Sequence, residues 1–359
     1  MNTSRCIRWL MILCLSSAPP CLSSAPPEVS GQNEPAAPVG LHNVVFSEYS
    51  PLTRTPDFLQ RVLSPLAAQA IQRKLADSDK PVAEQSVDLS KEEFVIYVPP
   101  HAPAHGYALM VFVPPWREAT VPSGWPRVFD QYGFIFVSAA RSGNDENPMA
   151  RREPLALLEV QNVIKRYNVD PGRIFVGGFS GGSRVAQRLA LDYPDVFHGA
   201  FLNAGSDPIG ASPVPLPSKD LLFRFQESSR IVYVTGARDL AHLSMDAASS
   251  RSMMKQCVYG IDTYSTPGRS HEIADSRALS EALRSLLIDV PPEPGRLAAC
   301  RATVWQELEE KLKKVETLLA SERRSAARDL ILNIDSSFGG LAAPRVIDLA
   351  QQCGCDILR

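Results

Sequence analysis

Short apolar runs recur along the middle of the chain and indicate the strands of a sheet. They occupy residues 94–98, 107–113, 133–140, 173–177, 199–204, 231–235 and 258–264. Apolar residues stand at consecutive positions in these runs, and helical patterns lie between several of them. Strands that are apolar on both sides belong to sheets that are covered on both faces, and such sheets are mainly parallel. The pattern therefore predicts an α/β fold, with a mainly parallel sheet and helices on both faces.

Apolar residues at helical spacing predict the helices around this sheet. Two such patterns cover residues 154–167 and 183–191, and Asp275 is placed to cap a third helix. Before the first strand, the spacing predicts a helix with Thr55 as its N-cap and a kink at Pro65. This N-terminal helical segment is expected to pack outside the sheet.

A proline-rich stretch at residues 291–295 separates the main body from a C-terminal extension. The extension, residues 296–359, carries two apolar stripes at helical spacing, over 304–319 and 326–334, and Pro344 is expected to start a short third helix. A helical hairpin of this kind must bury its stripes against something. We expect it to dock on the main body, or to bind a partner or a second copy of the chain.

The N-terminal residues have the pattern of an export signal. Arg5 and Arg8 precede a short apolar core at residues 9–15. We assign residues 1–27 to a signal peptide and 28–40, rich in proline, to a flexible tether. The chain is therefore predicted to be secreted or periplasmic, with the disordered N-terminus of a cytosolic protein as the open alternative.

Length and charge narrow the function classes. The chain has 359 residues and a formal net charge of −2. This length fits one α/β domain of about 250 residues, assigned to 41–290, and a smaller appendage. Near-neutral charge gives no reason to expect a nucleic-acid partner, and no apolar run approaches the roughly 20 residues of a transmembrane span.

Four cysteines lie outside the leader, namely Cys257, Cys300, Cys353 and Cys355. They allow three pairings, between which the sequence does not choose, and export predicts at least one disulfide among them. Cys353 and Cys355 are too close together for a typical zinc pair, and no histidine lies near them. The sequence therefore implies no metal site and no cofactor.

A glycine-flanked serine stands between an expected strand and an expected helix. The stretch Gly178-Phe179-Ser180-Gly181-Gly182 follows the apolar run 173–177 and precedes the helical pattern 183–191. This context is the one required by the G-x-S-x-G nucleophile elbow. Ser180 is thus a candidate nucleophile, and the Gly181 N–H a candidate oxyanion donor. The alternative is a glycine-rich turn with an incidental serine.

An activated serine needs a base, and the base needs an acid that orients it. Asp239 follows the run 231–235, and His271 follows the run 258–264. The order Ser180, Asp239, His271 predicts a catalytic triad. Asp246 is the alternative acid, and His242 is expected to line the mouth of the site.

With these motifs in place, residues from about 92 to 287 resemble the α/β-hydrolase superfamily. They are most similar to secreted esterases of the polyhydroxybutyrate depolymerase and feruloyl esterase type. The matching motifs are residues 178–182, 235–239 and 267–271. The resemblance implies an α/β-hydrolase fold and serine esterase chemistry, and it covers neither the leader, the first helix nor the C-terminal extension.

One loop departs from the pattern of this family. Many members carry a His-Gly-Gly type loop after the third strand, which supplies a second oxyanion donor. Here the loop reads Pro114-Pro115-Trp116-Arg117, and neither proline has an N–H. The backbone amide of Trp116, or that of Arg117, would have to donate instead.

The combined interpretation is a serine hydrolase that cleaves small-molecule or polymer carboxylic esters through an acyl-enzyme. Trp116, Trp125 and His242 are the candidate substrate-binding residues. Two other functions stay open. One is a serine peptidase resembling the catalytic domain of prolyl oligopeptidase. The other is a non-catalytic scaffold that binds a partner through its C-terminal helices.

Overall fold

The computed structural model describes residues 38–77, 83–288 and 290–354. The predicted signal peptide, 1–27, and most of the predicted tether, 28–40, lie outside the described residues. The tether ends earlier than predicted, because Gly40 already belongs to a strand.

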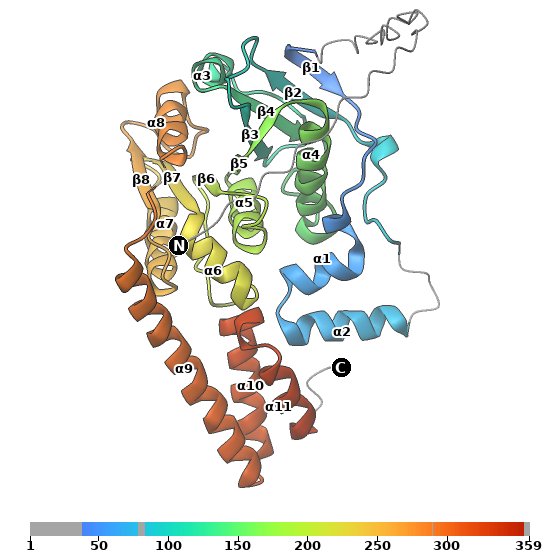
Figure 1. Cartoon of the computed structure of the whole chain (residues 1–359), viewed down its shortest axis with the longest axis vertical. Coiled ribbons are helices and arrows are strands. Elements are labelled where there is room, and N and C mark those ends of the chain that lie inside the picture. The colour runs from blue at the N-terminus through green and yellow to red at the C-terminus, as the bar shows by residue number, and fades with distance from the viewer. Residues whose placement is uncertain (1–37, 78–82, 289, 355–359) are drawn as a thin grey trace, which may run out of the picture. The chain divides into compact units, whose positions relative to one another are not determined.

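The described chain is built on an eight-stranded sheet (Figure 1). The strands are β1 (Gly40–Val44), β2 (Phe94–Val98), β3 (Tyr107–Val113), β4 (Phe134–Ala139), β5 (Val169–Phe179), β6 (Gly199–Asn203), β7 (Arg230–Gly236) and β8 (Ile261–Thr266). Their order is β1-β2-β4-β3-β5-β6-β7-β8, with β2 antiparallel to both its neighbours and all other pairs parallel. This is the predicted α/β-hydrolase fold.

The seven predicted strands are all present, and β1 is an addition. It pairs antiparallel with β2 at the edge of the sheet, and its residues alternate between half-buried and exposed. An edge strand of this kind lacks the continuous apolar run by which the central strands were predicted.

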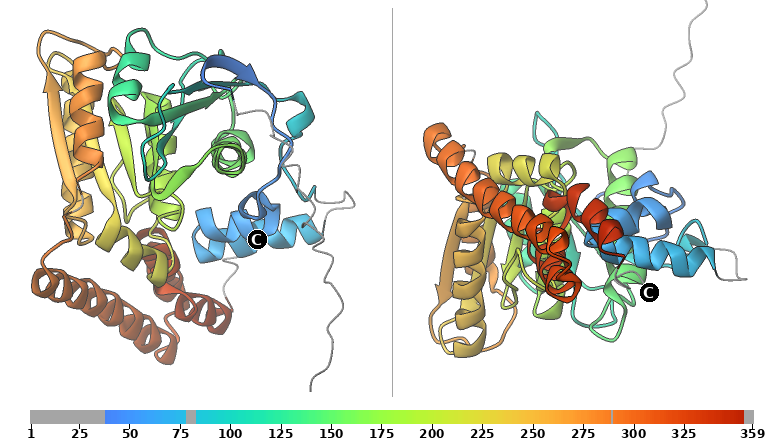
Figure 2. Two further views of the ribbon diagram at one scale, coloured as in Figure 1. Left: turned by 45° about the horizontal axis from the view of Figure 1, so that its top comes forward. Right: turned by 90° about the horizontal axis from the view of Figure 1, so that it is seen from below.

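Helices cover both faces of the sheet (Figure 2). One face of the sheet carries Leu109, Val111 and Val113 of β3 and is covered by α4, α5, α6 and α7. The other face carries the alternate residues of β3 and is covered by α3 and α8. The bounds are α3 (Trp125–Tyr132), α4 (Glu153–Arg166), α5 (Gly181–Asp192), α6 (Lys219–Ser228), α7 (Leu240–Lys255) and α8 (Ser276–Leu286). Asp275 caps α8 as predicted, its side chain accepting from the Ala278 N–H.

The N-terminal helical segment is two helices, α1 (Thr55–Val62) and α2 (Pro65–Ala76), rather than one kinked helix. The N-cap of α1 is Arg54, so Thr55 is already inside the helix. Pro65 begins α2 instead of bending a continuous helix, because proline fits the first helical turn and disrupts an interior. The Phe58 ring of α1 stacks on Tyr193 after α5, which places this segment outside the sheet as predicted.

The C-terminal extension consists of α9 (Pro294–Ala320), α10 (Arg324–Phe338) and α11 (Arg345–Cys353). Its apolar stripes join the same hydrophobic core as the helices on one face of the sheet, and the described residues form one compact unit. The predicted hairpin is thus docked on the body of the protein. The predicted linker is shorter than 291–295, since α9 already begins at Pro294.

A disulfide and a buried carboxylate are among the links that tie this extension to the body. A disulfide joins Cys257, after α7, to Cys300 in α9, which confirms the prediction of a disulfide among the four cysteines. The carboxylate of Asp335 in α10 accepts hydrogen bonds from the Ser64 hydroxyl and, at 3.0 Å, from the Leu66 N–H at the start of α2. Within the described residues, no helix combines the length and the apolar composition that a membrane span requires.

Asp335→Ala is expected to lower the free energy of unfolding by about 1–3 kcal/mol, because it leaves a buried N–H and a buried hydroxyl without their acceptor. Asp329→Ala is the matched control, since Asp329 lies in the same helix with its side chain exposed. Urea unfolding of both variants and of the wild-type protein measures the difference. Equal losses in the two variants would show that Asp335 does not hold the extension to α2.

Candidate active site

Ser180 stands at the sharp turn between β5 and α5. Its φ of 54° and ψ of −122° are a strained conformation for a residue with a side chain. Two glycines allow the turn to be this tight. A Cβ on Gly178 would lie 2.3 Å from the Gly182 carbonyl carbon, and a Cβ on Gly182 would lie 1.9 Å from the Val113 carbonyl oxygen. The local sequence therefore forms the predicted elbow.

Two hydrogen-bonding contacts in series link Ser180 to His271 and His271 to Asp239. The Ser180 Oγ is 3.0 Å from His271 Nε2, and His271 Nδ1 is 2.7 Å from Asp239 Oδ2. Ser180 follows β5, Asp239 follows β7 and His271 follows β8. The carboxyl ends of these parallel strands meet at one edge of the sheet, so the fold brings together three residues that lie far apart in sequence.

Asn203, at the end of β6, supports this arrangement and was not predicted from the sequence. It is buried, and its backbone carbonyl accepts from the Ser180 N–H at 2.8 Å. Its side chain accepts from the Ala274 N–H at 2.8 Å and donates to the Val234 carbonyl at 2.8 Å. Asn203 thus links the elbow, strand β7 and the loop that carries His271 through hydrogen bonds. The available signal for Asn203 in the sequence was a polar residue at the end of a buried strand.

The carboxylate that meets His271 is that of Asp239. Burial acts to raise the pKa of Asp239, but hydrogen bonds from His242 and His271 outweigh it and hold the pKa below its ordinary value. The alternative acid, Asp246, is engaged elsewhere: it accepts hydrogen bonds from the hydroxyls of Ser206 and Thr235, each at 2.6 Å. Burial raises the pKa of Asp246 against these bonds.

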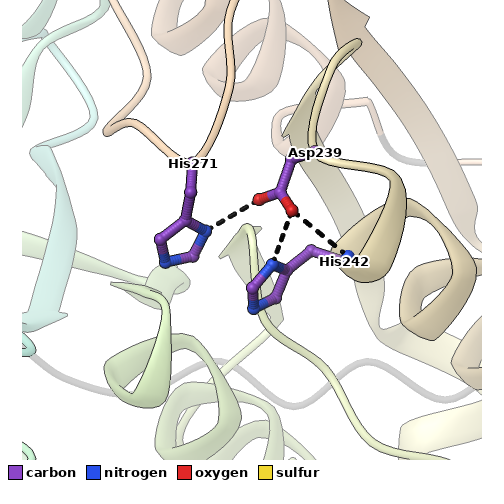
Figure 3. Close-up of side chains that lie close together, drawn as sticks. All are labelled: Asp239, His242 and His271. Carbon is purple, nitrogen blue, oxygen red and sulfur yellow. Dashed lines mark hydrogen bonds and ion pairs between the residues drawn. The ribbon is translucent and has the colours of Figure 1, made fainter.

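His242 lies on the other side of the same carboxylate (Figure 3). Its Nδ1 is 2.8 Å from Asp239 Oδ1, and its ring stacks on His271 with centroids 4.2 Å apart and planes at 20°. His242 was expected at the mouth of the site, and its contact with Asp239 was not predicted from the sequence. Asp239 caps α7 and His242 lies in its first turn, so the three-residue spacing was the available signal.

Trp125 does not line the mouth, which corrects the prediction that it could bind substrate. Its side chain is fully buried among aromatic residues, including Phe112, Phe136 and Phe201. Its indole N–H donates to the Ala274 carbonyl at 2.8 Å. Because Ala274 lies three residues after His271, Trp125 supports the loop that carries His271 from within the core.

The backbone amides of Gly181 and Trp116 are the two predicted oxyanion donors. The Gly181 N–H is the first of α5, so α5 holds no acceptor for it, and neither it nor the Trp116 N–H is hydrogen-bonded to any described residue. The Trp116 ring packs beside Phe179, with centroids 6.2 Å apart, and its Nε1 is buried without a partner among the described residues. Within the part of the chain that the structure describes, both predicted oxyanion donors therefore have an N–H without another hydrogen-bond partner.

Asn144, in the loop after β4, was not predicted from the sequence. Its backbone N–H donates to the Pro115 carbonyl at 3.1 Å, which ties this loop to the loop that holds Trp116. A Cβ on Gly181 would lie 2.2 Å from the Asn144 side-chain oxygen, so this amide rests against the start of α5. A side-chain amide in such a place can donate a hydrogen bond to an oxyanion. The available signal was its position after β4, because β4 lies next to β3 in the sheet and the loop after β3 carries Trp116.

Comparison with known proteins gives partial matches. No family model matches the chain. The chain is 30% identical over 104 residues to poly(3-hydroxyalkanoate) depolymerase C of Paucimonas lemoignei, covering 25% of this chain and 24% of that protein. It is 29% identical over 104 residues to feruloyl esterase B of Neurospora crassa, covering 26% of this chain and 34% of that protein. The chain thus spans about a quarter of the length of the first of these curated relatives and about a third of the second.

Among solved structures, S-formylglutathione hydrolase from Staphylococcus aureus aligns with a TM-score of 0.42 and 11% identity, over 55% of this chain and 93% of that one. The sequence matches are to proteins of the two types that the motifs predicted. Over about a quarter of its length, this chain is similar in sequence to a polyhydroxyalkanoate depolymerase and to a feruloyl esterase.

Proposed function

We propose that this protein is a serine hydrolase that cleaves carboxylic esters through an acyl-enzyme intermediate. The observation that carries the proposal is the series Ser180 Oγ, His271, Asp239, with separations of 3.0 and 2.7 Å at the end of the sheet. Nucleophile, base and orienting acid within hydrogen-bonding reach are what an activated serine requires. The partial sequence matches to ester-cleaving proteins support the same reaction class.

In the first half of the reaction, His271 Nε2 accepts the proton of the Ser180 hydroxyl while Oγ attacks the ester carbonyl carbon. Asp239 holds the ring so that Nδ1 carries its proton, and it stabilises the imidazolium that forms. The negative charge that develops on the carbonyl oxygen is bound by the Gly181 N–H, at the positive end of α5, and by the Trp116 N–H. His271 then donates its proton to the departing alcohol, leaving an acyl group on Ser180.

In the second half, water attacks the acyl-enzyme. His271 Nε2 takes a proton from this water, and the same amides bind the second oxyanion. Collapse of the intermediate releases the acid and returns the proton to Ser180 Oγ. These steps need no group beyond the chain and water, and one imidazole acts as base and then as acid in each half.

For the substrate, we propose short-chain or aromatic acyl esters, either as small molecules or within a polymer. The His271 side chain is 39% exposed, so the reacting atoms are accessible from solvent. Two prolines in the oxyanion loop remove two backbone donors that a stronger oxyanion hole would use. Esters have better leaving groups than amides and therefore demand less from the oxyanion hole and the general acid.

Paired assays test this proposal. We expect turnover of p-nitrophenyl butyrate and of a hydroxycinnamate ester, and no measurable cleavage of a peptide p-nitroanilide. A fluorophosphonate probe should label the wild-type protein on Ser180, as peptide mapping would show. A higher kcat/KM on the anilide would favour the peptidase. Absence of both turnover and labelling would favour the non-catalytic scaffold.

We also propose that the protein is exported. The leader pattern at residues 1–27 and the disulfide between Cys257 and Cys300 support this location, since disulfides persist in oxidising compartments. N-terminal sequencing of protein recovered from the culture medium or periplasm tests it. Recovery of the intact Met1 terminus from the cytosol would contradict it.

A further inference from the structure

Asp239 divides its two carboxylate oxygens between two histidines, although the proposed reaction uses only one of them. Oδ2 lies 2.7 Å from Nδ1 of His271, the proposed base (Figure 3). Oδ1 lies 2.8 Å from Nδ1 of His242 and 3.4 Å from the His242 backbone nitrogen, where Asp239 caps α7. One oxygen therefore faces the base, and the other is held by a residue that the reaction does not use.

The same contacts determine which ring nitrogens carry protons. The net effect of burial and of the hydrogen bonds from both histidines holds the pKa of Asp239 below its ordinary value, so its carboxylate is ionised near neutral pH. An ionised carboxylate only accepts hydrogen bonds, so the proton in each contact belongs to an imidazole Nδ1. In the neutral ring of His271, Nε2 then carries the free electron pair, 3.0 Å from Ser180 Oγ.

We propose that His242 is a positioning residue for the hydrolase reaction, rather than the substrate-binding residue expected from the sequence. Its Nδ1–H holds the rotation of the Asp239 carboxylate, and its ring holds the plane of the His271 imidazole. The effect on the reaction rests on the hydrolase function proposed above, whereas the arrangement of the three side chains does not. His242 itself transfers no proton, and the bonds that form and break are those of Ser180, His271, substrate and water.

The hydrogen bond of His242 acts on His271 through the carboxylate. Rotation about the last bond of an aspartate side chain is only weakly restricted, and it would move Oδ2 out of line with Nδ1 of His271. The backbone N–H of His242 holds Oδ1 only at 3.4 Å, whereas the ring Nδ1 holds it at 2.8 Å. Hydrogen bonds to an ionised acceptor are the stronger ones, so the ring contact is the main restraint on this oxygen.

The ring of His242 acts on His271 directly. The two imidazole centroids lie 4.2 Å apart with planes at 20°, which is a stacked arrangement. The Phe179 ring also lies against His271, with centroids 4.9 Å apart and planes at 30°. His271 lies in the loop between β8 and α8 with its side chain 39% exposed, so ring contacts rather than deep burial restrict its rotation. A base that is misplaced by about 1 Å can lose roughly 10²-fold in rate.

The exposure of His242 favours positioning over substrate binding. Its side chain is 23% exposed, compared with 39% for that of His271. Its Nδ1 is committed to Asp239, and its ring is stacked on His271. Only a small part of the ring is left for a substrate to contact.

Three substitutions separate the two contacts of His242. His242→Ala removes both, and it should lower kcat for p-nitrophenyl butyrate about 10²-fold. His242→Asn restores an N–H for Asp239, and His242→Phe restores a ring against His271, so each should recover about 10-fold of this loss. KM should stay within about 2-fold, because His271 is the base in both halves of the reaction and both halves slow together. Ser244→Ala, at an exposed position of the same helix, is the control and should match the wild type.

Proton NMR tests the arrangement without turnover. Ser180→Ala protein should show two low-field imidazole N–H signals, one from each Nδ1 that donates to Asp239. In this background, His242→Phe should remove one signal and shift or broaden that of His271. His242→Asn should return the His271 signal to its place, because the carboxylate regains a donor.

The outcomes separate this proposal from its rivals. Wild-type kcat in His242→Ala, or a His271 signal that His242→Phe leaves unchanged, would overturn the positioning role. A raised KM with an unchanged kcat would make His242 a substrate-binding residue instead. Absence of ester turnover in the wild type would count against the hydrolase function alone, because the NMR signals still decide whether His242 holds Asp239 and His271.

Discussion

Ser180→Ala should lower the rate of ester hydrolysis by roughly 10⁶-fold, the size of the loss when a serine hydrolase loses its nucleophile. Its hydroxyl is the atom that His271 Nε2 approaches at 3.0 Å, and no other described residue offers a nucleophile to that nitrogen. The melting temperature should be nearly unchanged, because the hydroxyl is only partly buried and its one side-chain hydrogen bond is to a partly exposed histidine.

Ser183→Ala provides the control on the same helix. The Ser183 hydroxyl is fully buried and donates to the Gly205 carbonyl rather than to a side chain of the triad. Its loss should lower the free energy of unfolding by about 1 kcal/mol and keep most of the activity. Hydrolysis of p-nitrophenyl butyrate and thermal unfolding, measured on both variants, separate the two effects. Wild-type turnover by Ser180→Ala would remove Ser180 from the reaction.

Asp239→Asn should lower kcat by about 10⁴-fold, as the equivalent change does in another serine hydrolase triad. The carboxylate accepts from His271 Nδ1, which keeps the electron pair of the ring on Nε2. An amide can instead donate to Nδ1, and the ring would then carry its proton on Nε2, where it cannot act as a base. The variant should therefore fold normally and still bind substrate.

Asp246→Asn is the matched control, because it makes the same change in the alternative acid. Asp246 accepts from Ser206 and Thr235 and is almost fully buried, so the substitution should alter stability more than turnover. Measuring kcat and urea unfolding for both variants decides between the two acids. If Asp246→Asn lost activity and Asp239→Asn kept it, the assignment of the acid would be wrong.

The strands show which parts of the fold the local pattern of apolar residues predicts. The predicted runs at residues 94–98 and 107–113 coincide with β2 and β3, because consecutive apolar residues between turns identify a fully buried strand. By contrast, α7 has no clear apolar stripe, and its most buried residues include Asp246 and Ser249. A helix that buries polar residues against polar partners cannot be predicted from apolar spacing.

The sequence by itself determined the α/β-hydrolase fold, the elbow around Ser180 and the order of the residues that come to lie near it. These features depend on local turn chemistry and on where each strand ends, and both can be read along the chain. The apolar stripes of the C-terminal helices likewise required a surface to cover them. Which surface they would cover was not local information, and α10 reaches α2 through Asp335, about 270 residues from Ser64 and Leu66.

Only the tertiary structure decided which side chains meet at the site. Trp125 supports Ala274 across 149 residues, Asn203 reaches the same loop across 71, and His242 shares Asp239 with a histidine from another strand end. A tryptophan near a predicted mouth and a tryptophan in the core have the same local sequence signature. The difference between them is set by the packing of helix α3 against the sheet, which no spacing along the chain records.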